Sequence, residues 1–417
     1  MSNLRVADRI RGFGTSIFSE ISALAAQLGA VNLGQGFPDF AGPEWVKQAA
    51  AEAIAADLNQ YAPAPGLPSL RAAIAKTWAA QGWRAIDPAS EVTVTSGATE
   101  ALCGAIFALI NPGDEVIFFE PFYDAYAADV VMAGGVPRYV RLYPPSTDGR
   151  RRTVDGENAG APSTIHRPSS SWWFDPTELA AAFSPRTRLL LLNTPHNPTG
   201  KVFSRTELEQ IAVLCIEHNV TVVADEVYDQ LVFSAAGHIP LATLPGMWER
   251  TLTINSVGKT FSLTGWKVGY AVGPADLSAA LRSTHQWLTF ATATPLQAAS
   301  AVALDQALAH GYYEQFRAEY RARCDLLRGG LEQAGLPTLA VEGSYFIIAD
   351  ASGAGFDNGA DFCRWLIREV GVASIPLSAF YANQENLPAL VRFCFAKRHE
   401  TLQAASDRLA QMVAPKR

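Results

Sequence analysis

Two lysines within one short, glycine-punctuated stretch have the most reactive chemistry in this sequence. Lys259 follows the apolar run 251–256, and Lys267 ends the turn Thr-Gly-Trp-Lys a few residues later. A lysine whose pKa is lowered by its surroundings is a nucleophile that forms a Schiff base with an aldehyde. The second lysine can hold a phosphate as a point charge. A solvated lysine is the usual alternative, but two of them in a stretch of low charge favour a functional site.

Asp225 closes another apolar run, Thr-Val-Val-Ala-Asp-Glu-Val-Tyr, which ends at Tyr228. A carboxylate at the end of a buried strand is costly unless a cation pairs with it. A protonated pyridine nitrogen is one such cation. A structural ion pair or a helix cap is the alternative.

Three further turns follow or precede apolar runs. The turn 193–200 can fix the amide side chains of Asn193 and Asn197 at a sheet edge. The segment 96–99 (Ser-Gly-Ala-Thr) opens a predicted helix, whose free N–H groups suit a phosphate. Tyr123 follows the run 115–119 and can stack on a flat ring. The structural alternatives are an ordinary turn for 193–200, a helix cap for 96–99 and core packing for Tyr123.

The apolar runs provide a common scaffold for these groups. Runs of strand length alternate with helical patterns, and a capping box at Ser204 and Glu207 opens one of the helices. Runs that are buried on both faces predict an α/β fold, with a mostly parallel sheet sandwiched by helices. Functional residues in such sheets lie just beyond the carboxyl ends of the strands. The predicted strands are 91–97, 115–121, 188–193, 221–228, 251–256 and 266–273.

The sequence pattern changes near residue 291, where long helical patterns begin, and this change predicts two domains. We expect a large cofactor-binding domain over residues 43–290. A smaller α+β domain would combine residues 1–42 with 291–417. The segment 144–171 is rich in Pro, Gly, Ser and Thr and is predicted to be a surface loop or hairpin.

The composition favours an enzyme that acts on small metabolites. Of the 417 residues, 49% are hydrophobic and 18% charged, and the net charge of −7 disfavours a nucleic-acid partner. No run reaches the roughly 18 apolar residues of a membrane span, and the N-terminus has no signal-peptide pattern. The five cysteines form no CxxC pair. We therefore expect no metal site, no membrane partner and a cytoplasmic location with reduced thiols.

Taken in their order along the chain, these motifs resemble the fold-type-I, class I/II aminotransferases, which depend on pyridoxal 5'-phosphate (PLP). The nearest resemblance is to the kynurenine/glutamine aminotransferases and to the bacterial methionine and N-succinyldiaminopimelate aminotransferases. The resemblance covers nearly the whole chain and implies a homodimer. The matching stretches include NLGQGFPDF, VTSGATEAL, EPFYDAY, LNTPHNPTGKVF, ADEVYDQLVF, TINSVGKTFSLTGWKVGY, GSYF and VRFCFAK.

The resemblance implies a role in cofactor binding or catalysis for each of these groups. Lys259 forms the internal aldimine and moves the proton between the substrate Cα and the cofactor C4′. Asp225 keeps the pyridine nitrogen protonated, so that the ring accepts electrons. The remaining contacts are hydrogen bonds to the 3′ oxygen from Asn197 and Tyr228, stacking by Tyr123, and phosphate binding by Ala98, Thr99, Ser256 and Lys267, with Tyr61 from a neighbouring subunit.

The substrate contacts also follow from the resemblance. Arg392 grips the α-carboxylate as a bidentate fork, helped by Asn197 and the Gly36 backbone. Asn193 matches a pocket position of the family. A side-chain pocket that tolerates apolar or aromatic groups is suggested by Phe18, Tyr61 and the stretch 285–290. Packing alone is the alternative explanation for these residues.

The reaction is expected to be a ping-pong transfer of an amino group to a 2-oxo acid. Glutamine, methionine, kynurenine or another aromatic amino acid is the expected donor. Two alternatives stay open: transamination of N-succinyldiaminopimelate, and a β-lyase reaction on cysteine S-conjugates. Two departures from the family matter. Lys267 stands where many relatives have arginine, and no arginine for a distal carboxylate can be assigned, so strict aspartate specificity is unsupported.

Overall fold

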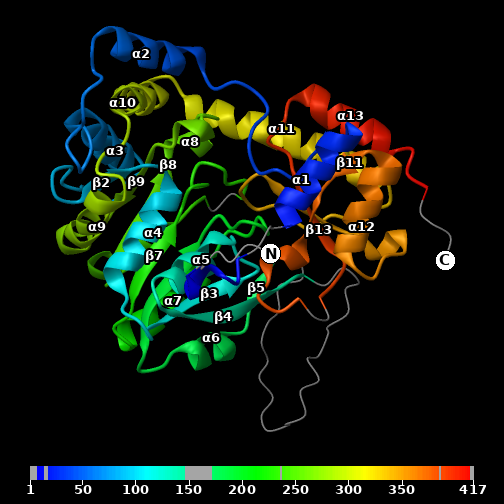
Figure 1. Ribbon diagram of the computed structural model, residues 1–417, viewed down its shortest axis with the longest axis horizontal. Coiled ribbons are helices and arrows are strands. Elements are labelled where there is room, and N and C mark those ends of the chain that lie inside the picture. Colours follow the sequence, from blue (N-terminus) through cyan, green and yellow to red (C-terminus); the bar gives the residue numbers. More distant parts are fainter. Residues whose placement is uncertain (1–6, 14–16, 146–170, 235–236, 385–386, 414–417) are drawn as a thin grey trace.

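The computed structural model describes residues 7–13, 17–145, 171–234, 237–384 and 387–413. Its main feature is an eight-stranded sheet in the order β2-β9-β8-β7-β6-β3-β4-β5 (Figure 1). Neighbours from β8 through β7, β6 and β3 to β4 are parallel, while β9 is antiparallel to both β2 and β8, and β5 to β4. The strands are β2 (Val92–Thr95), β3 (Glu115–Glu120), β4 (Val136–Tyr143), β5 (Trp173–Phe174), β6 (Thr187–Asn193), β7 (Thr221–Asp225), β8 (Thr251–Ser256) and β9 (Gly269–Val272).

The central strands are apolar on both faces because helices cover both faces. Along β6, Leu189 and Leu191 join one core cluster with α4, α5 and α9, whereas Leu190 and Leu192 join another with α6 and α7. This alternation is the two-residue period of a strand. Each of these leucines is at most 1% exposed, and burying one stabilises the fold by roughly 1.5–3 kcal/mol. The predicted mostly parallel, helix-sandwiched α/β sheet is therefore confirmed.

The helices that cover the sheet follow the predicted pattern. The predicted capping box is present at the start of α7, where the Ser204 side chain accepts from the Glu207 N–H and the Glu207 side chain accepts from the Ser204 N–H. The helices are α2 (Glu44–Ala55), α3 (Pro68–Ala80), α4 (Ala98–Leu109), α5 (Ala125–Met132), α6 (Pro176–Ala182), α7 (Arg205–Glu217), α8 (Val257–Thr260), α9 (Ala275–Leu288) and α10 (Thr294–Ala309).

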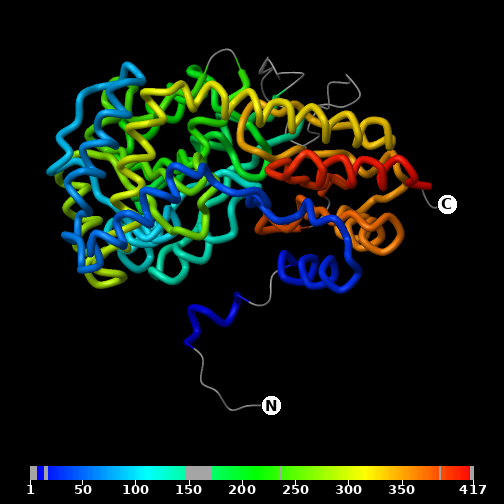
Figure 2. The backbone as a smooth tube through the Cα atoms, turned by 90° about the horizontal axis from the view of Figure 1, so that it is seen from above, coloured from blue at the N-terminus to red at the C-terminus, as the bar shows by residue number. Residues whose placement is uncertain are grey.

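The C-terminal part forms a second layer beside the sheet. An antiparallel sheet of order β10-β13-β12 packs with α11 and α12, and α13 packs along α11. The strand β1 pairs in parallel with β11 through Val31 and Val372. Figure 2 shows α1, near the blue end of the chain, lying against this C-terminal part. The elements are α1 (Ile17–Leu28), β1 (Val31–Asn32), α11 (Tyr312–Gln333), β10 (Phe346–Asp350), α12 (Gly359–Trp365), β11 (Val372–Ala373), β12 (Ile375–Pro376), β13 (Leu390–Cys394) and α13 (His399–Leu409).

The packing of α10 bears on the predicted domain boundary. This helix packs on α2 and α3 (Figure 1), which favours a boundary nearer residue 310 than 291. The division into 43–290 and 1–42 plus 291–417 remains an interpretation.

Short helical turns connect the larger elements. Most of the predicted loop 144–171 lies outside the described residues. None of the helices in the described part of the chain combines the length and the apolar character needed to cross a bilayer. The short turns are η1 (Asp8–Ile10), η2 (Leu241–Thr243), η3 (Trp248–Arg250), η4 (Thr264–Trp266), η5 (Ser352–Ala354), η6 (Leu366–Val370) and η7 (Leu377–Phe380).

Candidate active site

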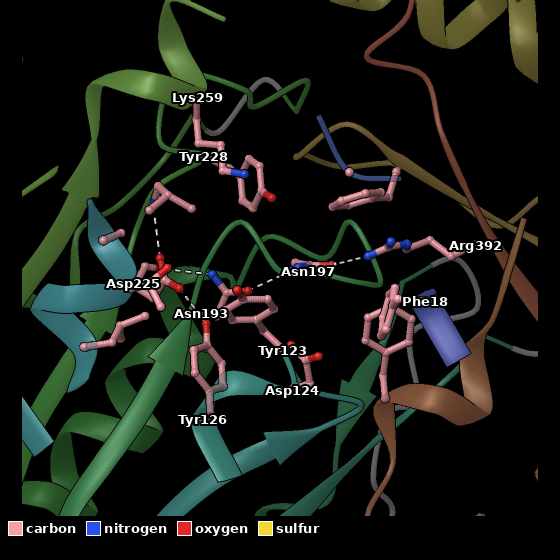
Figure 3. Close-up of a pocket in the computed structure, with 17 residues that line it drawn as sticks. Phe18, Tyr123, Asp124, Tyr126, Asn193, Asn197, Asp225, Tyr228, Lys259 and Arg392 are labelled. Atoms are coloured by element: carbon pink, nitrogen blue, oxygen red, sulfur yellow. Dashed lines mark hydrogen bonds between the residues drawn. The ribbon is translucent and has the colours of Figure 1, made fainter. Parts of the chain in front are cut away.

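A cavity of about 330 Å³ lies where the carboxyl ends of β6 and β7 meet the second layer. It is open on one side and is large enough for a small cofactor and substrate. Figure 3 shows Lys259 and Asp225 on one side of it and Arg392 on the other. All but three of the residues predicted for the site line the cavity, namely Phe18, Gly36, Ala98, Thr99, Tyr123, Asn193, Asn197, Asp225, Tyr228, Lys259 and Arg392.

Asp225 ends β7 and is only 5% exposed. One carboxylate oxygen accepts a hydrogen bond from the Tyr126 hydroxyl at 2.6 Å, and the other accepts from the Val227 N–H at 3.3 Å. Burial raises the pKa of Asp225 to about 6, and the two hydrogen bonds act in the opposite direction. A carboxylate in this position is matched to a bound cation, because a nearby positive charge offsets the cost of desolvation.

Lys259 lies in α8, the short helix that follows β8 directly. Its amine points into the cavity (Figure 3) and donates a hydrogen bond to the Tyr345 hydroxyl at 3.0 Å. The ring centroid of Tyr228 lies 5.7 Å from the amine nitrogen. An amine that faces an open cavity between aromatic rings is accessible to an aldehyde, which is the requirement for a Schiff base.

Arg392 projects from β13 and is 3% exposed. Its two terminal nitrogens donate to the Asn197 side-chain oxygen at 2.8 Å and to the Gly34 carbonyl at 3.0 Å. The guanidinium lies 4.0 Å above the Phe346 ring centroid. Its Nε has no hydrogen-bond partner among the described residues. Burial lowers the pKa of Arg392 to about 10, so the group is cationic at neutral pH and can bind a carboxylate.

The turn after β6 connects the two charged ends of the site. Asn193 donates its amide hydrogen to the Asp225 carbonyl at 2.9 Å and accepts from the Asn197 N–H at 2.7 Å. The Asn197 oxygen in turn accepts from Arg392. Because the oxygen of Asn197 is engaged in this way, its NH₂ group is the part available to donate to a ligand.

The start of α4 has groups that are suited to bind an anion. Gly97 has φ +85°, and a Cβ there would lie 3.0 Å from the Lys267 amine. A Cβ on Gly269 would lie 2.5 Å from the Ala98 nitrogen, so this approach requires glycine. The first N–H groups of a helix have no partner within the helix, and together with the Lys267 amine they are suited to bind a phosphate. We call Gly97, the N–H groups that follow it and Lys267 the phosphate cradle.

Three predicted residues do not line the cavity within the single chain. Lys267 lies behind Gly97, as described above. Ser256 accepts from the Gly258 N–H at 3.2 Å and so caps α8. Tyr61 is 85% exposed and packs edge-on against Phe290, with ring centroids 5.3 Å apart. Trp287 is 83% exposed, so most of the predicted aromatic stretch 285–290 faces outward.

Sequence reasoning missed several residues that the fold brings to the cavity. Asp124 and Tyr126 belong to the quoted motif EPFYDAY, and their closeness in sequence to Tyr123 is the signal that could have indicated them. Phe346 belongs to GSYF. The remaining wall residues without an earlier prediction are Leu102, Val227 and Phe380. These had no distinguishing local signal.

The donor set fits PLP. The amine of Lys259 suits the aldehyde, the buried carboxylate of Asp225 suits the ring nitrogen, and the cradle at Gly97 and Lys267 suits the phosphate. In contrast, the described residues contain no cluster of three or more His, Cys, Asp or Glu side chains placed to hold a metal ion.

Comparisons with known proteins agree with this geometry. The family model for aminotransferase class I and II matches residues 29–409. A kynurenine–oxoglutarate transaminase of Dictyostelium discoideum is 41% identical over 96% of this chain and 94% of its own. A probable N-succinyldiaminopimelate aminotransferase of Mycobacterium tuberculosis is 45% identical over 96% of this chain and 97% of its own.

Solved structures give the same result. The structure of N-succinyldiaminopimelate aminotransferase from Mycobacterium tuberculosis matches with a TM-score of 0.88 and 44% identity, covering 98% of this chain and all of that one (100%). An Escherichia coli protein with a methionine aminotransferase function matches with a TM-score of 0.89 and 40% identity, again over 98% and 100% of the two chains. The chain therefore belongs to the aminotransferase class I and II family and is a PLP-dependent aminotransferase.

Proposed function

We propose that this aminotransferase moves the amino group of a neutral or aromatic amino acid, such as glutamine, methionine or kynurenine, to a 2-oxo acid. The observation that carries the proposal is the convergence of Lys259, Asp225 and Arg392 on one cavity with an aromatic wall. When bound, PLP supplies a ring that accepts the electrons released at the substrate Cα.

Lys259 would hold PLP through its amine, and the same amine would carry the proton that leaves the substrate Cα. Asp225 keeps the ring nitrogen protonated. At neutral pH its carboxylate is ionised, since its pKa of about 6 lies below that pH, and the cation it faces removes the cost of its burial. The other predicted contacts keep the ring fixed: Asn197 and Tyr228 at the 3′ oxygen, Tyr123 on the ring face, and Ala98, Thr99, Ser256 and Lys267 at the phosphate.

Arg392 sets the orientation of the substrate by binding its α-carboxylate, with Asn197 and Gly36 beside it. Phe18, Phe346 and Phe380 line the cavity around the Arg392 guanidinium, and we expect the substrate side chain to lie against this aromatic wall. Arg392 is the only arginine of the described cavity wall, and the exposed carboxylate of Asp124 also lines it. A second carboxylate on the substrate would meet Asp124 rather than a cation, so a neutral side chain is favoured over an acidic one.

A homodimer is part of the proposal. Tyr61 is exposed, packs beside Phe290 and does not line the cavity of its own chain. Exposed aromatic side chains that lie together mark an interaction surface. A second copy would cover them and receive Tyr61 at its own cradle. A reducing, cytoplasmic compartment is consistent with the five free cysteines.

Transamination of N-succinyldiaminopimelate is the second candidate, because the relative at 45% identity bears that name. A panel of donors and acceptors on the purified holoenzyme separates the two. We expect glutamine, methionine or kynurenine to react. Turnover of the succinylated substrate alone would refute the proposal and favour the second candidate.

The covalent attachment is tested separately. Borohydride treatment of the holoenzyme followed by peptide mass spectrometry should label Lys259, and Lys259→Ala should abolish transamination. Label on another lysine, or near-normal turnover of Lys259→Ala, would refute the assignment.

A further inference from the structure

Tyr345 connects Lys259 with Gly36, two predicted site residues that are distant in sequence. Its hydroxyl accepts a hydrogen bond from the Lys259 amine at 3.0 Å and donates its own proton to the Gly36 carbonyl at 2.6 Å. The residue is 0% exposed and lies immediately before β10. We propose that Tyr345 is a positioning residue, which holds the Lys259 amine whenever that amine is not bonded to the cofactor and links it to the backbone at the substrate carboxylate site.

The direction of the two hydrogen bonds defines what Tyr345 can do. A phenol has one proton, and here that proton is directed at Gly36. Only an oxygen lone pair therefore faces Lys259, so the amine must be the donor. Burial also raises the pKa of Tyr345 well above its ordinary value, so the hydroxyl keeps its proton at working pH. Tyr345 thus orients the amine and does not exchange a proton with it.

The phenol is held in place by its neighbours. The ring of Tyr345 packs edge-on against Tyr228, with centroids 5.0 Å apart, and against Phe346 at 4.7 Å. Tyr320 stacks on it with a centroid distance of 6.3 Å. A side chain packed on several sides has little rotamer freedom. The released amine therefore finds its acceptor at a constant position, which is what rapid proton delivery to the same atom in every turnover requires.

Gly36 belongs to a segment, residues 34–37, that we call the carbonyl strap. Its Gly34 carbonyl accepts from Arg392 at 3.0 Å, and its Phe37 carbonyl accepts from the buried Lys397 amine at 2.7 Å. Three carbonyls of the strap therefore accept from three buried side chains. Through Tyr345, the strap connects the arginine that binds substrate with the lysine that moves the proton.

The test uses the holoenzyme of Tyr345→Phe, which keeps the ring and removes only the oxygen. This inference rests on the proposed role of Lys259. Loss of one positioning hydrogen bond should lower kcat about tenfold and change KM by less than about threefold. The kinetic isotope effect with Cα-deuterated donor should increase, because the proton transfer limits turnover more strongly. Near-UV circular dichroism and bound-cofactor absorbance verify the fold.

Two control variants distinguish an effect on the Lys259 amine from an effect on the carbonyl strap. Tyr320→Phe removes a hydroxyl beside Tyr345 that bonds neither Lys259 nor Gly36, and should behave as wild type. Lys397→Met removes the hydrogen bond to the Phe37 carbonyl of the strap and leaves the hydrogen bond between Lys259 and Tyr345 in place. In cofactor-free protein, amide hydrogen exchange over residues 34–37 should increase in both Tyr345→Phe and Lys397→Met, whereas the isotope effect should change only in Tyr345→Phe.

An unchanged kcat and isotope effect in Tyr345→Phe would overturn the inference. A rise in KM alone would overturn it as well, because the phenol would then support only the strap. Retained turnover in Lys259→Ala would be a different failure, namely of the proposed function itself.

Discussion

Replacing Asp225 by Asn should stabilise the cofactor-free protein and impair the loaded enzyme. Asn has the shape and charge of a protonated Asp, and it can keep both hydrogen bonds, since the Tyr126 hydroxyl can accept as well as donate. The substitution therefore removes the buried negative charge and little else. Its effect on the free energy of unfolding follows from the pKa of Asp225.

Burial raises that pKa from an ordinary 3.8 to about 6. The folded chain therefore retains a proton that the unfolded chain has lost between these pH values, so stability decreases as pH rises through this window. The cost of the charge is about 1.5 kcal/mol at pH 5 and about 3 kcal/mol at pH 7.5, where it is fully present. Asp225→Asn should recover most of this energy at pH 7.5 and about half of it at pH 5.

The assay is urea unfolding of the cofactor-free wild type and variant, followed by tryptophan fluorescence at both pH values. With PLP bound, the wild type should be more stable than Asp225→Asn, because the carboxylate then faces a cation. The variant should bind PLP more weakly and lose most of its kcat. A variant that is less stable than wild type without cofactor at pH 7.5, or a difference that is equal at both pH values, would refute the reasoning.

Four further substitutions test other parts of the site. Arg392→Ala should raise KM for every amino and oxo acid by about a hundredfold, and an effect on one substrate alone would mean that Arg392 reads the side chain. Asp124→Asn should raise kcat/KM for glutamate relative to glutamine about tenfold, and an unchanged ratio would contradict its proposed influence on specificity. Gly97→Ala should weaken PLP binding about tenfold in equilibrium titration, because its Cβ would lie 3.0 Å from the Lys267 amine; unchanged affinity would argue against the cradle. Tyr61→Phe should weaken PLP binding without changing the sedimentation of the protein, whereas a monomeric wild type would contradict the proposed homodimer.

Local patterns were sufficient for much of the fold. The four consecutive leucines of β6 predicted a strand buried on both faces, and both faces are covered by helices. Ser204 and Glu207 predicted the start of α7, because a capping box uses only groups within one turn. Such signals depend on neighbours in the sequence. The packing of α10 on α2 and α3 depends on residues that are distant in sequence, so the domain boundary near residue 291 stays an interpretation.

By itself, the sequence determined the elements, the order of the motifs and the family, because strand periods, helix caps and turn residues are local properties and the motifs recur in known relatives. It also indicated Lys259 and Asp225 by residue type and position, and Arg392 through the resemblance to the family. Only the tertiary structure decided which distant groups touch. The Tyr345 hydroxyl and the Gly36 carbonyl are 309 residues apart in sequence, and Arg392 and Asn197 are 195 apart. No local pattern specifies such a pair, since a hydrogen bond depends on the position of both partners in space, and that position is set by how the whole chain packs.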